Sequence, residues 1–159
     1  MGRTAKPAET RFWEHVDKKG DDDCWQWTGR IEPNGYARFR PSPDISHPRK
    51  GAHVFSFALA SGRSVTPGMT IDHLCHDPAT CSAGFKCPHR SCVNPRHLAE
   101  VSYAFNVLRG NGTGARNARK VNCQRGHPLN GDNLFINANG ARVCITCRRE
   151  NDSARRNRS

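Results

Sequence analysis

The stretch IDHLCHDPATCSAGFKCPHRSCVNPRHL, residues 71–98, holds four of the eight cysteines of the chain and four of its eight histidines. Cysteine thiolates and histidine imidazoles are the usual protein ligands of zinc. An imidazole can also act as a general base, because its pKa lies close to neutral pH. The stretch therefore indicates either a metal site that only holds the chain folded or a metal site with chemistry beside it.

The rest of the chain is poor in apolar side chains. Its 159 residues predict one domain, or a small domain with an appendage. Leu, Ile, Val and Phe together number 26, about 16% of the residues, below the roughly 20% at which a charged chain is suspected of disorder. Hydrophobic burial alone is therefore expected to be too weak to fold the protein. A structural zinc ion can contribute about 10 kcal/mol of folding free energy, so bound metal is the expected source of the remainder.

The cysteines are expected to be reduced thiols. The N-terminal sequence MGRTAKPAETRFWEHV lacks the apolar segment of a signal peptide, and no apolar run approaches the roughly 20 residues of a membrane span. These observations predict a soluble cytoplasmic protein with no membrane partner. In that compartment, cysteine close to histidine indicates metal binding rather than a disulfide.

Positive charge gathers toward the C-terminus. The formal net charge of the chain is +11, and residues 109–159 contain 11 Lys or Arg against 3 Asp or Glu. Basic segments of this kind usually bind nucleic acid, and no amphipathic apolar face lies near these charges to favour a membrane surface. The alternative is a solvated, disordered tail.

Composition and turn signals divide the chain into five segments. We predict a flexible N-terminus, a main domain, a linker, a second small unit and a basic tail. Their boundaries are residues 1–10, 11–110, 111–121, 122–150 and 151–159. The short elements expected within them give a small α+β fold.

The main domain is expected to combine strands and helices. Asn34-Gly35 predicts the turn of an N-terminal antiparallel hairpin. A helix is predicted to end at Gly62, and a short strand to end at His73. Apolar residues close to helical spacing predict a further helix, and they are Leu98, Val101, Phe105 and Leu108.

The second small unit has the ligand spacing of a zinc site. The segments CQRGH and CITC place two pairs of ligands on either side of a loop the size of a hairpin. Turn signals at Asn130-Gly131 and Asn139-Gly140 mark that loop. The predicted ligands are Cys123, His127, Cys144 and Cys147.

The opening stretch predicts another zinc site. Cys75, Cys92 and His97 supply three ligands, and Cys24, far upstream beside two tryptophans, is the best candidate for the fourth. Because a catalytic zinc keeps one position open for water, four protein ligands predict a structural ion.

His73 stands apart from this zinc site. It lies two residues before Cys75, so a bound ion would fix its backbone without His73 becoming a ligand. A rigidly held histidine can act as a general base. Asp72 and Asn106 offer hard oxygen ligands suited to magnesium. On residue types alone, phosphodiester hydrolysis and a purely structural zinc knot are equally supported.

The segment DHLCH, followed by CVNPRHL and then Asn106, resembles the HNH, or His-Me finger (ββα-metal), endonucleases. It is similar to the zinc-bound subgroup that includes small phage proteins and a homing endonuclease of a slime mould. CWQWTG, NGYARF, AHVFSFALASG and CQRGH…CITC are also similar, so the resemblance covers about residues 11–149. It implies a zinc-stabilised ββα-metal core with an N-terminal hairpin and a C-terminal zinc-binding hairpin unit, in the cytoplasm of a host cell if a phage encodes the chain.

The resemblance also implies roles for single residues. His73 matches the general base that activates water, Asn106 matches the metal-binding residue of the helix, and Asn94 matches the residue that braces the loop. Asp72 matches a ligand of the catalytic ion in some members only. The implied reaction is cleavage of double-stranded DNA, by a monomer or a homodimer, with magnesium or another divalent cation. It leaves 5′-phosphate and 3′-hydroxyl ends.

An insertion between Cys75 and Cys92 departs from the family pattern. It adds Cys81, Cys87 and His89 close to His76. These four residues could form a zinc site of their own, rearrange the ligand set of the neighbouring site, or remain free in a loop. The expected number of structural zinc ions is therefore two or three.

Basic residues on several segments are expected to contact DNA phosphates. Arg38 and Arg40 alternate along a predicted strand, where either could clamp the scissile phosphate or simply face solvent. His53, at the start of a predicted helix, could be a cap, a core residue or a neighbour of the active site, and a structural role is favoured. A non-catalytic zinc-dependent DNA-binding protein is the competing function, and RNA is the alternative substrate. The predicted DNA contacts are Arg38, Arg40, Arg109, Arg116, Arg119 and Lys120.

Overall fold

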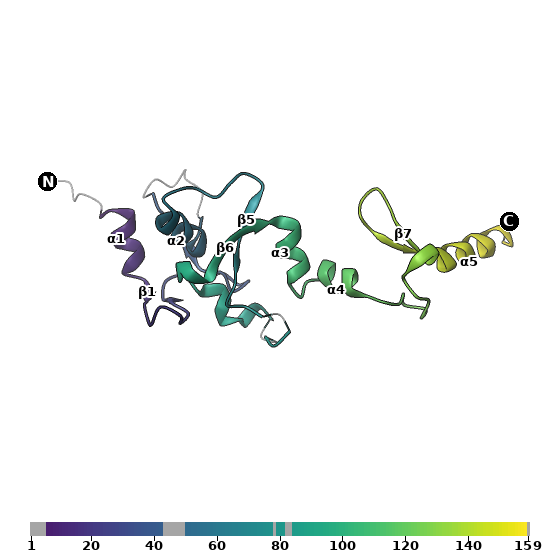
Figure 1. Cartoon of the computed structure of the whole chain (residues 1–159), viewed down its shortest axis with the longest axis horizontal. Helices are drawn as coiled ribbons and strands as arrows, with labels where there is room; N and C mark the ends of the chain where they lie inside the picture. Colours follow the sequence, from purple (N-terminus) through teal and green to yellow (C-terminus); the bar gives the residue numbers. More distant parts are fainter. Residues whose placement is uncertain (1–5, 43–49, 78, 82–83, 159) are drawn as a thin grey trace. The chain divides into compact units, whose positions relative to one another are not determined.

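The computed structural model describes residues 6–42, 50–77, 79–81 and 84–158. The chain divides into two compact units, Met1–Asn106 and Val107–Ser159. Each unit combines short helices with short antiparallel strand pairs, which confirms the small α+β class (Figure 1). Within the described ranges, no helix has the length and apolar character needed to cross a membrane.

The first unit is built from many short elements. Its helices are α1 (Ala8–Trp13), α2 (Ala52–Ser61) and α3 (Tyr103–Arg109), the last of which runs into the second unit. Its strands are β1 (Val16–Asp17), β2 (Gln26–Trp27), β3 (Arg38–Phe39), β4 (Lys50–Gly51), β5 (Met69–His73) and β6 (Leu98–Ser102). Single 3₁₀ turns are η1 (Gly84–Lys86), η2 (Pro88–Ser91) and η3 (Pro95–His97).

An aromatic cluster forms the core of this unit. Phe12 of α1 is fully buried, and its ring centroid lies 5.2 Å from Trp27, 5.3 Å from Phe39 and 5.1 Å from Phe55. Tilted and edge-to-face contacts at these distances are the favourable ones for aromatic rings. Because α1, β2, β3 and α2 each contribute one large ring, a chain with few aliphatic residues still forms a small core.

The strand pair β5–β6 frames the cysteine-rich stretch. The two strands pair antiparallel from Met69↔Ser102 to His73↔Leu98, and they lie side by side in Figure 1. The strand expected to end at His73 is therefore confirmed. Residues 74–97 form the connection between the two strands. Both ends of that connection meet beside His73, because His73 and Leu98 are the last pair of the ladder.

The helix predicted to include Leu98 and Val101 is wrong in its first part. Residues 98–102 form β6, and the helix begins at Tyr103. The spacing of the apolar residues fits both structures over so short a segment. Pairing with β5 decides between them, because it satisfies the backbone groups of β6 and suits the β-branched Val101.

Two turns form as predicted. Gly62 ends α2 with a φ of 67°, the left-handed conformation that glycine adopts without steric cost. Gly35 follows Asn34 with a φ of 84°, and its N–H donates to the carbonyl of Glu32 at 2.8 Å. The N-terminal hairpin itself is smaller than expected, because this turn joins only a single bridge between Ile31 and Ala37. The neighbouring strands pair elsewhere, β2 with β1 and β3 with β4.

The second unit contains a zinc-type hairpin flanked by helices. Its elements are α4 (Thr113–Arg119), η4 (Gly131–Asn133), β7 (Leu134–Ile136), β8 (Arg142–Cys144) and α5 (Ile145–Arg156). The antiparallel pair β7–β8 confirms the expected hairpin.

Two of the predicted segments, the linker and the tail, contain helix that was not expected. Helix α4 lies inside the range 111–121 interpreted as a linker, and α5 covers most of the range 151–159 interpreted as a tail. Of the N-terminal segment, residues 1–5 lie outside the described residues, and α1 begins at Ala8. The five-segment division stays a prediction.

Asn94 connects the N-terminal loop to the connection between β5 and β6. Its side chain is fully buried and donates from Nδ2 to the carbonyl oxygens of Asp21 and Asp23, each at 2.7 Å. Its Oδ1 accepts from the backbone N–H of Arg96 at 3.0 Å. The loop before Cys24 is thus held against the start of η3, as expected of a bracing residue.

We predict that Asn94→Ala lowers the free energy of unfolding by about 3 kcal/mol, because it removes three hydrogen bonds made by a fully buried side chain. Chemical denaturation with zinc in excess measures the change. The exposed Asn139 is the control, and Asn139→Ala should change stability by less than about 0.5 kcal/mol. Equal effects of the two substitutions would contradict the bracing role.

Candidate functional site

The central cluster consists of Cys24, Cys75, Cys92 and His97, and their ligand atoms all lie within 4.8 Å of one another. The Nδ1 atom of His97 is 3.7 Å from the sulfur of Cys24 and 3.6 Å from that of Cys92. Such spacings suit a tetrahedral zinc ion bound by three sulfurs and one nitrogen. The predicted ligand set, including the distant Cys24, is therefore brought together.

The three thiols of the central cluster differ in pKa, and only Cys92 favours the thiolate, because burial raises the pKa of Cys24 to about 11. A hydrogen bond from Cys75 lowers the pKa of the Cys92 thiol to about 4, and the same contact raises the pKa of Cys75. Thiolate is the species that binds zinc, and the lowered pKa favours the thiolate of Cys92 without a bound ion.

The insertion cluster consists of His76, Cys81, Cys87 and His89. The sulfur of Cys87 lies 3.3 Å from that of Cys81, 3.4 Å from Nδ1 of His76 and 3.3 Å from Nδ1 of His89. Of the three alternatives left open by the sequence, these distances support a separate ligand set. The insertion leaves the central cluster undisturbed.

The C-terminal cluster consists of Cys123, His127, Cys144 and Cys147. The sulfur of Cys147 lies 3.7 Å from that of Cys123 and 3.2 Å from Nδ1 of His127. All eight cysteines lie in the described part of the chain, and none of them forms a disulfide. The chain thus gathers three Cys/His clusters that could bind zinc, each with a closed set of four protein ligands.

His73 lies beside the central cluster without belonging to it. Its side chain is only 5% exposed, and Nε2 lies 3.1 Å from the carbonyl oxygen of Cys92. A carbonyl oxygen only accepts hydrogen bonds, so Nε2 carries the proton and Nδ1 is the basic nitrogen of the neutral ring. Burial lowers the pKa of His73, which favours that neutral form. The arrangement suits a general base.

A second histidine packs against His73. The ring centroids of His53 and His73 are 4.8 Å apart, and Tyr36 lies 5.6 Å from His53. Burial lowers the pKa of His53 to about 3, with smaller effects from His73 and Arg38. Its Nδ1 has no hydrogen-bond partner within the described residues. The sequence favoured a structural role for His53 over that of an active-site neighbour, and nothing in its spacing indicated this contact.

Two arginines lie near this pair of histidines. Arg38 is close enough to His53 to affect its pKa, and its Nε lies 3.7 Å from the carboxylate of Glu32. The guanidinium of Arg90 lies over the ring of Tyr36, at 5.1 Å from the centroid. Arg38 was predicted from the sequence, whereas Arg90 was not, because it belongs to the insertion.

The predicted magnesium ligands are half-buried. Asp72 accepts a hydrogen bond at Oδ1 from the backbone N–H of His73, at 2.8 Å. Asn106 lies in α3, which follows β6 directly. In the described ranges, Asp72 joins none of the Cys, His and carboxylate clusters. The role of Asp72 and Asn106 as magnesium ligands stays a prediction.

The predicted DNA contacts differ in their surroundings. Arg119 donates to the carbonyls of Leu108 at 3.2 Å and Gly110 at 2.9 Å, so it ties α4 to the preceding loop. Arg116 and Lys120 are exposed. Arg40 is half-buried, and its carbonyl accepts from the side chain of Arg11 at 3.1 Å. Arg109 is also half-buried, in the last turn of α3.

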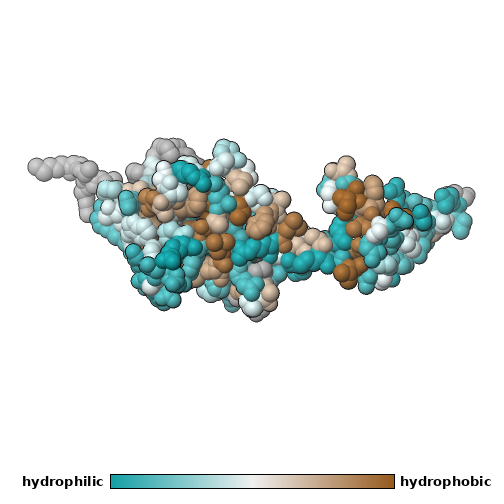
Figure 2. All heavy atoms as spheres, viewed as in Figure 1, coloured by the Kyte–Doolittle hydropathy of each residue, from teal (hydrophilic) through white to brown (hydrophobic). Residues whose placement is uncertain are grey.

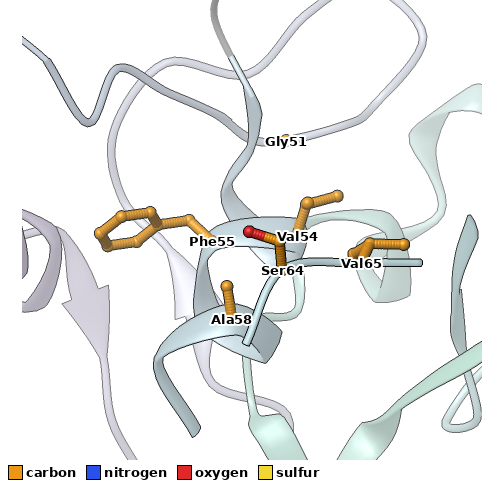
Figure 3. A pocket seen from close by; sticks show the side chains of 6 residues that line it. All are labelled: Gly51, Val54, Phe55, Ala58, Ser64 and Val65. Carbon is orange, nitrogen blue, oxygen red and sulfur yellow. The ribbon is translucent and has the colours of Figure 1, made fainter. Parts of the chain in front are cut away.

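An apolar pocket of about 330 Å³ lies beside α2 (Figure 3). Its lining offers one side-chain hydroxyl and otherwise apolar groups, so it contains no general base. The lining residues are Gly51, Val54, Phe55, Ala58, Ser64 and Val65.

Comparisons with known proteins give no further guide to this site. No protein-family model matches the chain, and searches of curated proteins and of solved structures likewise give no match.

We predict that the protein purified without added metal contains three zinc ions per chain, one for each cluster. Cys87→Ser and Cys144→Ser should each lower the zinc content by one, because they break different clusters. Elemental analysis measures the metal, and the two variants serve as controls for each other. A zinc content unchanged by Cys87→Ser would show that the insertion cluster holds no ion.

We also predict that His53 makes stability depend on pH. Its pKa is about 3 in the folded chain against 6.5 in the unfolded chain, so only the unfolded chain takes up its proton between these values. Its contribution is complete above pH 6.5 and is lost as the pH falls toward 3. From pH 6.5 to about 5, the free energy of unfolding should fall by about 2 kcal/mol.

His53→Leu should remove this part of the pH dependence. Denaturation of both proteins at the two pH values, with zinc in excess, measures it. Equal losses in the wild type and in the variant would contradict the assignment to His53.

Proposed function

We propose that the chain is a metal-dependent DNA endonuclease of the HNH type, which hydrolyses phosphodiester bonds. The observation that carries the proposal is the hydrogen bond from His73 Nε2 to the carbonyl of Cys92, at 3.1 Å. It leaves Nδ1 as the basic nitrogen on a ring that packing against His53 holds in place. A neutral imidazole held in one orientation can take a proton from water, and Arg38, close to His53, could bind a phosphate.

His73 acts in this proposal as the general base. Nδ1 takes a proton from a water molecule as its oxygen attacks phosphorus, and the bond to the 3′-oxygen breaks. The products are a 5′-phosphate and a 3′-hydroxyl. Asp72 and Asn106 offer oxygen atoms suited to magnesium, and a divalent cation held by them would stabilise the negative charge of the transition state.

Arg38 is the proposed phosphate clamp. It lies beside His53, which packs on His73, and its side chain is 40% exposed. A guanidinium can donate two parallel hydrogen bonds to phosphate oxygens. The position and exposure of Arg38 support this role over that of an ordinary surface arginine.

A second candidate is a zinc-dependent DNA-binding protein without catalysis. The observation that favours it is the second unit, where the C-terminal cluster adjoins the basic helix α5. Binding alone requires no particular tautomer at His73, so that residue separates the two candidates.

We predict that the wild type cleaves plasmid DNA in the presence of Mg²⁺, and that His73→Ala lowers the rate at least about 100-fold, because the general base is lost. His15 is exposed and lies outside the site, so His15→Ala should leave the rate within about twofold. Gel analysis of the plasmid measures cleavage, and a parallel assay with RNA tests the alternative substrate. A wild type that binds plasmid but stays inert with every divalent cation would refute the nuclease proposal.

A further inference from the structure

We propose that the outer face of α5 is a DNA-recognition surface that lies in the major groove of a duplex. The inference rests on the proposed function in that it takes DNA as the partner, and it adds the element and the groove. Helix α5 spans 12 residues with the sequence ITCRRENDSARR. The arginines of this face are Arg148, Arg149, Arg155 and Arg156.

One end of α5 is fixed to the second unit. Cys144 and Cys147 of the C-terminal cluster lie at its N-terminal end. Asn133 accepts at Oδ1 from the backbone N–H of Thr146 at 2.9 Å and from its hydroxyl at 2.8 Å. A metal cluster and these hydrogen bonds therefore set the direction in which the helix leaves the hairpin, as Figure 1 shows for α5 and β7.

One side of α5 faces the second unit. Glu150 accepts from Arg125 at 2.9 Å, and the side chain of Asn151 accepts from the same arginine at 3.3 Å. Residues 147, 150 and 151 share this side, because helix neighbours recur at three and four positions. At 3.6 residues per turn, the four arginines fall within about 120° of one another on the opposite side.

The outer face is exposed and almost free of apolar groups. Every residue from Arg148 to Arg158 is exposed, and Ala154 is the only apolar residue in that range. The end of the second unit around α5 is hydrophilic in Figure 2. Such a face cannot bury enough apolar area to dock on a protein groove or enter a membrane. Four arginines against Asp152 instead complement a polyanion.

The dimensions of α5 fit a DNA groove. A helix of this length is about 18 Å long and, with side chains, about 10–12 Å wide. The major groove of B-DNA is about 12 Å wide and admits one helix. Arginines at the borders of the face reach phosphates, or guanine edges, while Asp152 in its centre can accept a hydrogen bond from the amino group of cytosine.

Binding to a mixed-sequence DNA duplex of roughly 30 base pairs, measured by fluorescence anisotropy without added Mg²⁺, tests the inference. We expect Arg149→Gln and Arg156→Gln each to raise Kd roughly fivefold and to reduce the salt slope by about 1. Arg125→Gln is the control. It also removes one positive charge, but Arg125 contacts α5 on the side opposite the outer face. It should change Kd by less than about twofold, with zinc content unchanged in every variant.

The groove is tested separately. Methyl green, which occupies the major groove, should compete with the protein, whereas the minor-groove ligand distamycin should not. A-form RNA has a major groove too narrow for a helix, so an RNA duplex of the same length should bind more weakly. Equal effects of Arg125→Gln and Arg149→Gln, competition by distamycin alone, or equal affinity for RNA would each overturn the inference.

The outcome is independent of cleavage. The same anisotropy measurements on the His73→Ala variant should show the same dependence on Arg149 and Arg156. If the wild type proves inert as a nuclease while these arginines still control binding, the proposed function fails and the α5 inference stands. If the wild type cleaves DNA while binding ignores both arginines, the reverse holds.

Discussion

Cys92 takes part in two interactions on which the rest of the site depends. Its sulfur belongs to the central cluster, and its carbonyl oxygen accepts the hydrogen bond of His73 at 3.1 Å. A metal ion that holds the sulfur also holds the carbonyl, since both belong to one buried residue. The orientation and tautomer of His73 therefore depend on a metal site in which His73 takes no part. Folding and the proposed chemistry share a single constraint.

Val93, the residue after Cys92, connects the central cluster to the aromatic core through two hydrogen bonds of its backbone. Its N–H donates to the carbonyl of Trp25 at 2.8 Å, and its carbonyl accepts from the Ser56 hydroxyl at 2.6 Å. The residue after the candidate ligand Cys92 is thus bonded to the residue before β2 and to α2, both of which belong to the surroundings of the aromatic core. A core of few rings and a cluster of sulfurs stabilise each other here, because neither is large enough to order the connection of 24 residues between β5 and β6 alone.

Much of the candidate site could be predicted from the sequence, because zinc ligands have restricted chemistry and short spacings. Even the distant Cys24 lies with the three residues that the sequence grouped it with. The strand β6 was missed, since its pairing with β5 is a non-local interaction. The sequence could not decide whether His53 is a neighbour of the site, because its contact with His73 is also non-local. Residues 151–156 of α5 were interpreted as part of a tail because they are almost all polar, and the start of the helix is held by the C-terminal cluster.

The tautomer of His73 shows whether the bond to the carbonyl of Cys92 orients the ring. Long-range ¹H–¹⁵N correlation NMR of the imidazole at neutral pH distinguishes a proton on Nε2 from one on Nδ1. We expect a neutral ring protonated at Nε2 in the zinc-loaded protein, and loss of this single form when a chelator removes the metal. A proton on Nδ1, or a ring that averages both tautomers with zinc bound, would contradict the account.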